Sequence, residues 1–514
     1  MFSLSNIMLG FRQIASVDVI IALFVGVVGG MIIGALPGFS AVMGVSILIP
    51  LTYGMSPTAA LAMLTALYTS AIYGGSISGI LCHAPGTNAS AASAIDGFEL
   101  TKQGRGMEAI GVSTLSSMIG GIFSAIAMLL IAPLLGAFSL KFSVLEYFLL
   151  SVFGLTVMGS LAGESFVKGM FSGILGLLLG CVGLDAISGI PRMTLGSLNL
   201  EDGINFVPAL IGLFSISQVM TLAWDVYHGN NGSVIEDEEN LKHSKILPPW
   251  KELKVLFPTI FRSSIIGTVV GIIPAAGAGV ASWLCLSTGK RFSKHPEKFG
   301  HGSFEGVASC EAGNNAATGG ALIPLITLGI PGSGVTAILL GALIMHGLTP
   351  GASMFSKFAA TTYGVMDSFL IANILMGLIG LLIVRYVAKI STVRIGYLGP
   401  MIVALSCLGT YAIRGNIFDV CIMLIFGIFG FIMKKCGFAA PPMILGMVLS
   451  EICESNWRRA VILARAKGGL FRYFIGRPIA VVLFILILIS LFSPLFSKLM
   501  KKKQAEAAES EQTP

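Results

Sequence analysis

Several uninterrupted apolar runs in this chain of 514 residues are long enough to cross a lipid bilayer, and no other feature restricts its possible folds so strongly. A helix needs about 20 apolar residues to cross the hydrocarbon core, and only helices or closed barrels satisfy their backbone groups there. The clear runs are 17–36, 114–137, 143–161, 204–224, 363–388, 417–433 and 478–497. With the shorter and interrupted segments between them, they predict an all-α polytopic membrane protein of about 10–14 membrane segments.

Composition agrees with this class and excludes several others. The chain is 55% hydrophobic and only 11% charged, which is typical of a protein whose main partner is membrane lipid. The net charge of +7 comes largely from Lys and Arg in loops, as is usual beside membrane helices, so we expect no nucleic-acid partner. The 8 cysteines lack the paired spacing of a zinc or redox motif, and we expect no metal site.

A degenerate internal repeat is the second constraint. The stretch Gly34–Gly97 returns from Gly271 onward, with matching segments in the same order. Gly34-Ala35-Leu36-Pro37 aligns with Gly271-Ile272-Ile273-Pro274, Gly74-Gly75-Ser76 with Gly319-Gly320-Ala321, and Pro85-Gly86-Thr87 with Pro331-Gly332-Ser333. Interrupted apolar segments at matching places in two halves indicate the substrate site of a secondary transporter. We therefore predict broken or re-entrant helices in two structural repeats, related by a pseudo-two-fold axis and inverted.

The repeat also predicts the domain organisation. Residues 1–228 form the first membrane repeat half, residues 229–254 a polar linker, and residues 255–498 the second half. The charged tail 499–514 is expected to be disordered. A single Pro-Gly pair in a membrane helix is usually only a kink or a packing site, and it is the matching of the breaks that favours a binding site.

The residues that follow the breaks suit an anion. Proline ends a helix, and the helix that restarts beyond it offers unpaired N–H groups and the positive end of its dipole, which a nearby hydroxyl complements. The breaks contain no Lys or Arg, so backbone N–H groups and hydroxyls are expected to hold the oxygens of a carboxylate. The predicted substrate-binding residues are Pro37, Gly38, Ser40, Ser76, Pro85, Gly86, Thr87, Pro331, Gly332, Ser333 and Thr336.

A cation site is predicted within the second repeat, at Glu311, Asn314 and Asn315. Accumulating a multiply charged anion against an interior-negative potential costs about 2.3 kcal/mol per charge per 100 mV. No ATP-binding P-loop is present, so cotransport of Na⁺ or H⁺ is the expected source of energy. The alternative interpretation is that the two asparagines hydrogen-bond across helices and that Glu311 lies at the membrane interface.

Three segments closely resemble the large membrane subunit of the bacterial tripartite tricarboxylate transporters, the TctA family. They are GALPGFSAVMGVSILIPLTYGMSP, YGGSISGILCHAPGT with the following Asp96-Gly97, and EGVASCEAGNNAATGGALIPLITLGIPGSGVTAILLGALIMHGLTPG. The resemblance covers roughly residues 17–470 and implies a multi-pass permease of a bacterial inner membrane. It further implies two partners, a small four-helix membrane subunit (TctB) and an extracytoplasmic solute-binding protein (TctC) that delivers an organic carboxylate. The chain departs from the family pattern at Cys82-His83, at Cys310 and at Gly313.

Other classes of function remain as alternatives. An intramembrane protease would need a catalytic or zinc constellation, and the chain has no HExxH motif. A catalytic or metal-binding role for His83 and His346 is therefore disfavoured, and we expect neither enzymatic activity nor a cofactor beyond the coupling ion. A purely structural subunit is disfavoured because duplicated broken helices are costly in a membrane. A channel, or an ion-coupled carrier that works without a binding protein, stays open.

Overall fold

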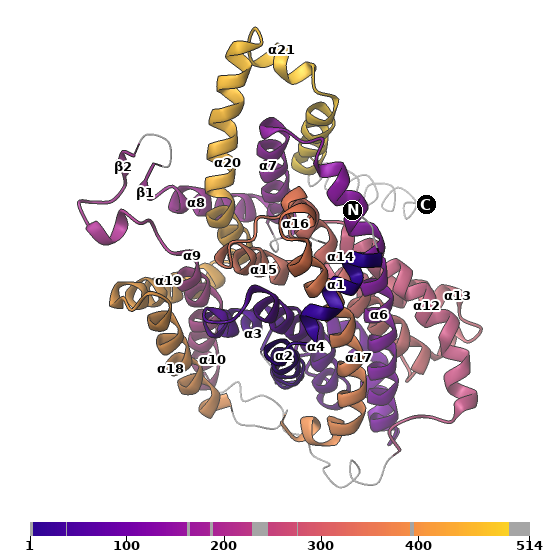
Figure 1. Cartoon of the computed structure of the whole chain (residues 1–514). Helices are drawn as coiled ribbons and strands as arrows, with labels where there is room; N and C mark the ends of the chain where they lie inside the picture. Colours follow the sequence, from indigo (N-terminus) through magenta and orange to yellow (C-terminus); the bar gives the residue numbers. More distant parts are fainter. Residues whose placement is uncertain are drawn as a thin grey trace, which may run out of the picture. The chain divides into compact units, whose positions relative to one another are not determined.

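The computed structural model describes residues 4–36, 39–161, 165–185, 189–228, 245–274, 276–390 and 395–492 (Figure 1). The chain divides into two compact units. Unit 1 comprises Met1–Ser139 and Val207–Phe431, and unit 2 comprises Leu140–Phe206 and Ile432–Pro514. Residues 229–244 of the predicted linker 229–254 and the whole tail 499–514 lie outside the described residues.

Unit 1 contains both copies of the repeat. Its first part holds α1 (Leu4–Ile14), α2 (Val17–Ala35), α3 (Ala41–Leu48), η1 (Ile49–Thr52), α4 (Pro57–Cys82), η2 (Asn88–Ser90), α5 (Ala91–Lys102) and α6 (Gly106–Ser139). Its second part holds α9 (Phe206–Ile211), the π-helical η4 (Gly212–Ile216), α10 (Ser217–Tyr227), α12 (Trp250–Ile272), α13 (Gly277–Phe292), η5 (Pro296–Lys298), α14 (Phe304–Leu328), α15 (Gly334–Met345), α16 (Ala352–Ser356), α17 (Ala359–Ile390), α18 (Ile395–Arg414) and α19 (Ile417–Lys435).

Unit 2 is smaller and almost wholly helical in its described part. It holds α7 (Val144–Leu161), α8 (Phe166–Gly180), β1 (Gly183–Leu184), β2 (Pro191–Arg192), η3 (Leu198–Leu200), α20 (Ala440–Ala466), α21 (Leu470–Ile475) and an apolar helix, Pro478–Phe492. The two short strands pair antiparallel. Arg192 and Arg458 both pair with the buried carboxylate of Asp185, so ion pairs connect this hairpin to α20.

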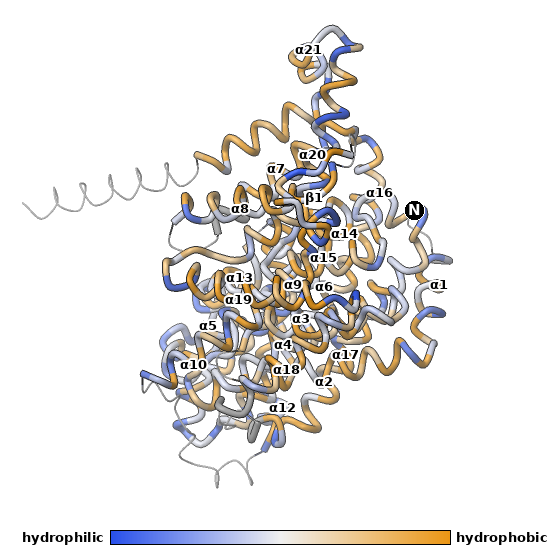
Figure 2. The backbone as a smooth tube through the Cα atoms, turned by 90° about the vertical axis from the view of Figure 1, so that its left-hand side faces the viewer, coloured by the Kyte–Doolittle hydropathy of each residue, from blue (hydrophilic) through white to orange (hydrophobic). Residues whose placement is uncertain are grey.

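The class predicted from the sequence is confirmed. Seven helices in the described residues are long and apolar enough to cross a membrane, and five shorter apolar helices accompany them. Hydrophobic residues dominate these helices along most of their length (Figure 2). Large apolar side chains such as Phe24, Leu134 and Leu382 are exposed on α2, α6 and α17, as expected for surfaces that face lipid.

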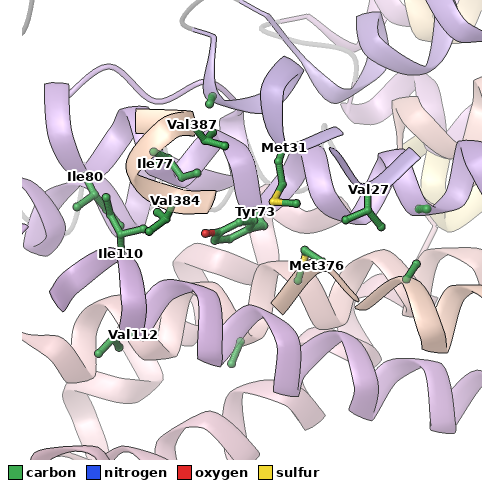
Figure 3. Close-up of a cluster of buried hydrophobic side chains, with 14 of the residues drawn as sticks. Val27, Met31, Tyr73, Ile77, Ile80, Ile110, Val112, Met376, Val384 and Val387 are labelled. Atoms are coloured by element: carbon green, nitrogen blue, oxygen red, sulfur yellow. The ribbon is translucent and has the colours of Figure 1, made fainter. Parts of the chain in front are cut away.

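Two helices, α4 and α14, form the centre of unit 1. Every residue of α4 from Thr58 to Leu81 is buried, and so is every residue of α14 from Gly306 to Thr327. Both helices are rich in Gly, Ala, Ser and Thr, and these small residues let neighbouring backbones approach closely within a membrane. Figure 3 shows the apolar part of this packing, where Tyr73 and Ile77 of α4 lie among Met31 of α2 and Met376 of α17.

The two central helices run antiparallel. Ser76, late in α4, contacts Glu311, early in α14, whereas the earlier Thr69 contacts the later Asn315 and Thr318. These helices are equivalent members of the two repeats. An antiparallel pair of equivalent helices is what an inverted repeat requires, so this geometry supports the predicted inversion.

Backbone contacts establish the register of the two copies. A Cβ atom on Gly34 would lie 2.3 Å from the carbonyl oxygen of Ala71, and one on Gly271 would lie 2.4 Å from that of Ala317. Thus α2 packs on α4 as α12 packs on α14. In the same way Gly74 approaches Met31 as Gly320 approaches Thr268. Gly74 therefore corresponds to Gly320, and the sequence alignment with Gly319 was wrong by one residue, because a Gly-Gly pair fits either register.

We predict that replacing either Gly34 or its equivalent Gly271 by alanine destabilises the fold. G34A and G271A each place a methyl group against a carbonyl oxygen of the neighbouring central helix, and overpacking of this kind costs about 1–3 kcal/mol. Thermal unfolding of the detergent-purified protein should show a lower midpoint for both. G29A is the matched control in α2, because no atom lies within 4 Å of its added methyl group. An equal effect of all three changes would contradict the proposed close contacts.

Candidate functional site

The first break joins α4 to α5 through Pro85, Gly86 and Thr87. Pro85 is exposed, and the N–H of Gly86 donates to the carbonyl oxygen of Gly75 at 3.1 Å. A side chain at Gly86 would collide with the carbonyl oxygen of Gly34, so the loop lies directly against α2. Thr87 then caps the next helical turn in a capping box with Ser90, whose hydroxyl accepts from the Thr87 N–H at 3.3 Å.

The second break repeats this arrangement before α15. The N–H of Ser333 donates to the Thr336 hydroxyl at 2.7 Å, and the N–H of Thr336 donates back to the Ser333 hydroxyl at 3.3 Å. The register of the repeats makes Ser333 and Thr336 the equivalents of Thr87 and Ser90. A Cβ on Gly277, the first residue of α13, would lie 3.7 Å from the Cβ of Ser333. Two helix starts therefore converge at Ser333, and their dipoles favour an anion there.

Each central helix also reaches the break of the other repeat. The Tyr68 hydroxyl of α4 lies 3.2 Å from the Ser333 hydroxyl. In α14 the equivalent residue is Asn314, whose side-chain amide donates to the carbonyl oxygen of Ala89 in η2 at 3.5 Å. Thr69 and Asn315, also equivalent, contact each other at 3.2 Å. Reciprocal contacts of this kind are characteristic of two units around a two-fold axis, with Thr69 and Asn315 beside it.

The predicted anion-binding residues differ in their accessibility. Ser40 is exposed and caps α3 by accepting from the N–H of Met43, and Ser333 is half-buried. Thr87 is 8% exposed and Thr336 is fully buried, so Thr336 lies behind Ser333 as its capping partner. Pro331 and Gly332 are buried in the second break. Pro37 and Gly38 lie outside the described residues.

A buried polar network surrounds Glu311. Its carboxylate is fully buried and accepts hydrogen bonds from the hydroxyls of Ser76 (2.7 Å), Ser113 (3.1 Å) and Ser117 (3.1 Å), and from the Asn314 amide (3.1 Å). The sequence predicts that Ser76 contacts the substrate, and in the structure its hydroxyl donates to the Glu311 carboxylate. In the described part of the chain no Lys, Arg or His forms an ion pair with this carboxylate.

Asn314 and Asn315 extend this network, and their two side-chain oxygens are acceptors without a donor among the described residues. The Asn315 amide nitrogen contacts Thr69, the Ser117 carbonyl oxygen and the side-chain oxygen of Asn373 on α17. The side-chain oxygens of Asn314 and Asn315 are buried without a hydrogen-bond partner among the described residues. Buried amide and carboxylate oxygens are hard ligands that a small cation such as Na⁺ accepts. The chemistry of this donor set therefore fits a cation.

A second buried carboxyl group was not identified from the sequence. Asp367 of α17 is fully buried, and neither of its oxygens has a hydrogen-bond partner in the described residues. It faces α1, because a Cβ on Gly10 would lie 2.1 Å from one of these oxygens. Ionisable residues inside membrane helices usually have a function, which makes Asp367 a further candidate for proton binding.

Asp96 connects the two repeats outside the long membrane helices. One carboxylate oxygen of Asp96 in α5 accepts from the backbone N–H groups of Gly300 (2.7 Å), Gly302 (3.2 Å) and Ser303 (2.9 Å), just before α14. Burial raises the pKa of Asp96, and these three hydrogen bonds oppose the rise. A residue at the end of the first repeat thus fixes the start of the second central helix.

The departures from the family pattern have local explanations. His83 is the left-handed C-cap of α4, with φ of 53°, where the second repeat has Gly329, with φ of 71°. The His83 ring packs on Phe98, whereas His346 contacts the Thr52 hydroxyl at 3.1 Å, so the two histidines occupy different environments. Cys310 is buried, and a side chain at Gly313 would collide with the Cys285 thiol.

The sequence analysis overlooked the partners of the predicted residues. Tyr68, Ser90, Ser113, Ser117 and Asn373 complete the network, yet each is an ordinary residue of an apolar or Ser-rich helix in the sequence. Only the register seen in the structure, with Gly74 opposite Gly320, pairs Tyr68 and Thr69 with Asn314 and Asn315; the sequence alignment at Gly74 would have paired them with Gly313 and Asn314. The serines of α6 and Asn373 of α17 carry no such signal, because they lie outside the repeated stretch.

Comparisons with known proteins identify relatives along nearly the whole chain. A protein described as the uncharacterized 52.8 kDa protein in the TAR-I ttuC' 3'region of Agrobacterium vitis is 36% identical over 480 residues, covering 93% of each chain. An uncharacterized protein in the TAR-II ttuC' 3'region of the same organism is 36% identical over 237 residues, which is 46% of this chain and 97% of that protein. No solved structure matches the chain.

The family comparison covers the two breaks and the buried network together. The model of the tripartite tricarboxylate transporter TctA family matches residues 20–445. This match includes the central helices, both capping boxes and Glu311. The chain is therefore a multi-pass membrane protein that belongs to the TctA family, the membrane permeases of tripartite tricarboxylate transporters.

Proposed function

We propose that this permease imports an organic carboxylate of the tricarboxylate or dicarboxylate type and uses a cation gradient, of Na⁺ or H⁺, as its source of energy. The observation that carries the proposal is the buried carboxylate of Glu311, which forms no ion pair with a Lys, Arg or His of the described residues and is connected through Asn314 to the first of the two breaks. A buried charge must be neutralised, and a bound Na⁺ or H⁺ is the natural neutralising species here.

The substrate half of the proposal rests on the two breaks. Each presents a capped helix start at an equivalent position, and the residues Pro85–Thr87 and Pro331–Thr336 include no Lys or Arg. Carboxylate oxygens would accept hydrogen bonds from backbone N–H groups and from the accessible hydroxyl of Ser333. The duplication of the break supports a substrate with a carboxylate at each end, which in this proposal binds one carboxylate at each break.

Asn314 provides a route for coupling the cation to the anion. Its amide nitrogen lies 3.1 Å from the Glu311 carboxylate and 3.5 Å from the Ala89 carbonyl oxygen, two residues after Thr87. A cation at Glu311 would attract the Asn314 side-chain oxygen, which otherwise has no partner in the described residues. Cation binding would thereby change the contact that α14 makes with the first break.

Two protein partners complete the proposed system, namely a small four-helix membrane subunit and an extracytoplasmic solute-binding protein. Family membership supports both. The proposed location is a bacterial inner membrane, where the binding protein would deliver the carboxylate from the outer side. A channel or a carrier without a binding protein is the competing function.

Counterflow decides between a carrier and these alternatives. Proteoliposomes containing the chain and its two partner subunits are loaded with unlabelled citrate or succinate and then supplied with the labelled compound. A carrier accumulates label transiently, whereas a channel only equilibrates it and an enzyme converts it. Counterflow without the binding protein would favour the simpler carrier, and its absence for every carboxylate offered would refute the proposed substrate class.

We predict that T87A and S333A each raise the KM for carboxylate uptake. Each removes a hydroxyl and loosens the helix start that would bind the anion, and a hydrogen bond to a charged group contributes about 1.5–3 kcal/mol, which is roughly a tenfold to hundredfold change. S56A is the matched control, because Ser56 caps the exposed start of α4 in the same manner. Unchanged uptake by the T87A/S333A double variant would place the anion elsewhere.

Tyr68 provides a second test of the site at Ser333. Y68F removes the hydroxyl that lies 3.2 Å from Ser333, and we expect the KM for carboxylate to rise severalfold while the protein stays folded. Y73F is the control, because Tyr73 is an equally buried tyrosine of α4 whose hydroxyl contacts Thr114 at 2.7 Å instead. If both variants change KM equally, Tyr68 acts only through the packing of α4.

The cation site is tested by combining E311Q with N315A. We expect uptake to lose its dependence on the Na⁺ or pH gradient while exchange of carboxylate across the membrane survives, because the anion-binding breaks remain intact. E305Q makes the same change on the same helix at a carboxylate that pairs with Thr259 and Ser293, and it should keep the ion dependence. Full ion dependence in a folded E311Q/N315A protein would exclude this cluster and direct attention to Asp367.

A further inference from the structure

Unit 2 contains a basic pocket that the transport proposal does not use. The pocket has a volume of about 350 Å³ and is lined by Glu146, Lys467, Arg472, Tyr473, Gly476, Arg477, Pro478 and Ile479. Three of the eight side chains are cationic and one is acidic. The pocket lies where α20, α21 and the apolar helix Pro478–Phe492 follow one another in the chain.

The single acidic residue of the pocket is already neutralised. Glu146 is fully buried, and its carboxylate accepts from the Arg477 guanidinium at 2.5 Å and from the N–H of Ser143 at 3.0 Å. Lys467 and Arg472 are exposed, and neither forms an ion pair with a carboxylate in the described part of the chain. The pocket therefore has an excess of two positive charges.

The backbone adds to this positive potential. Residues Gly468 and Gly469, with φ of 83° and 111°, turn the chain between α20 and α21, and α21 contributes Arg472 to the pocket. The next helix begins at Pro478, which itself lines the pocket, and the N–H of Val481 donates to the Arg477 carbonyl oxygen. The positive end of that helix dipole therefore faces the same space.

The surroundings of the pocket are those of a membrane interface. On α21, Leu470, Phe471 and Ile475 are exposed, with Phe471 78% exposed, beside the basic Arg472. The helix that follows exposes further large apolar side chains, among them Val482, Ile485 and Ile489. Figure 2 shows hydrophilic residues interspersed in the outer part of α20 and in α21, whereas the helix 478–492 is hydrophobic. Exposed apolar side chains beside a basic residue, directly before an apolar helix, are typical of a segment that lies in the headgroup region.

We infer that this pocket binds the phosphate headgroup of an anionic phospholipid. Basic pockets beside membrane helices recognise such headgroups, and each Lys or Arg near the surface strengthens the binding of an anionic lipid about fivefold. Lys467, Arg472 and the start of the helix at Pro478 surround the phosphate, and the exposed apolar side chains of α21 and of residues 478–492 contact the acyl chains. A zwitterionic lipid carries its own positive charge and gains little from the two unpaired cations.

Titration of the detergent-purified, delipidated chain, followed by native mass spectrometry, tests this site. Phosphatidylglycerol should bind the wild-type protein about thirtyfold more tightly than phosphatidylcholine, the ratio expected for two cationic side chains without an ion pair. If the wild-type protein binds the two lipids with equal affinity, this result alone overturns the proposal. Inorganic phosphate is the third probe, and displacement of phosphatidylglycerol by phosphate at low millimolar concentration would identify a soluble phosphate ligand instead.

A matched pair of variants locates the binding. K467Q/R472Q removes the two unpaired charges and should reduce the preference for phosphatidylglycerol to nearly one, with an unchanged thermal midpoint. R459Q/R465Q removes the same net charge from exposed positions on α20 outside the pocket and should retain the preference. Arg477 stays in both variants, because its loss would leave the buried Glu146 unpaired. A preference that survives K467Q/R472Q, or that both variants lose equally, would refute the assignment to this pocket.

Discussion

The close packing of the central helices, of α4 on α2 and of α14 on α6 and α12, is the interaction on which the arrangement of unit 1 depends. Both helices are buried along almost their whole length, so neither faces lipid. Apolar side chains do not drive association inside a bilayer, since lipid tails are equally apolar, and helices must associate through close packing and polar contacts. Glycines at the interfaces with α2 and α12 permit that packing, and any added methyl group would meet a carbonyl oxygen.

The breaks beside these helices contain helix ends whose backbone N–H groups need hydrogen-bond partners. A capping box supplies partners for two N–H groups at each restarted helix, with Thr87 and Ser90 in one repeat and Ser333 and Thr336 in the other. The remaining N–H groups and the helix dipole then favour an anion. The local geometry that gives these backbone groups their partners is therefore the same geometry on which the proposed anion binding rests.

The buried carboxylate of Glu311 is the acidic group of the candidate site. Glu311 receives four hydrogen bonds but no ion pair among the described residues, and two unpartnered amide oxygens lie on the same helix. The first of the two proposed anion sites and the proposed cation site meet at Asn314, which contacts the Ala89 carbonyl oxygen and the Glu311 carboxylate. Because one side chain contacts both groups, binding of a cation at Glu311 would change the affinity of the first break for an anion.

The sequence alone determined the membrane class, the positions of the breaks and their duplication. The length of an apolar run and the position of a Pro-Gly pair are local properties, so they can be read directly from the sequence. It also directed attention to Ser333 and Glu311, because hydroxyls after a break and a carboxylate in an apolar run are unusual. The alignment failed by one residue at Gly74, where only a carbonyl contact with a neighbouring helix distinguishes the two registers.

Only the tertiary structure decided which polar groups meet. Tyr68 reaches Ser333 across 265 positions of sequence, and Ser76 reaches Glu311 across 235. Neither contact follows from periodicity, because the antiparallel pairing of two helices depends on how all their neighbours pack. The excess charge of the pocket at Lys467 and Arg472 likewise appears only once Arg477 is seen to neutralise Glu146. Which distant side chains pair is a property of the folded chain, because it depends on how the helices pack, and the sequence by itself does not indicate it.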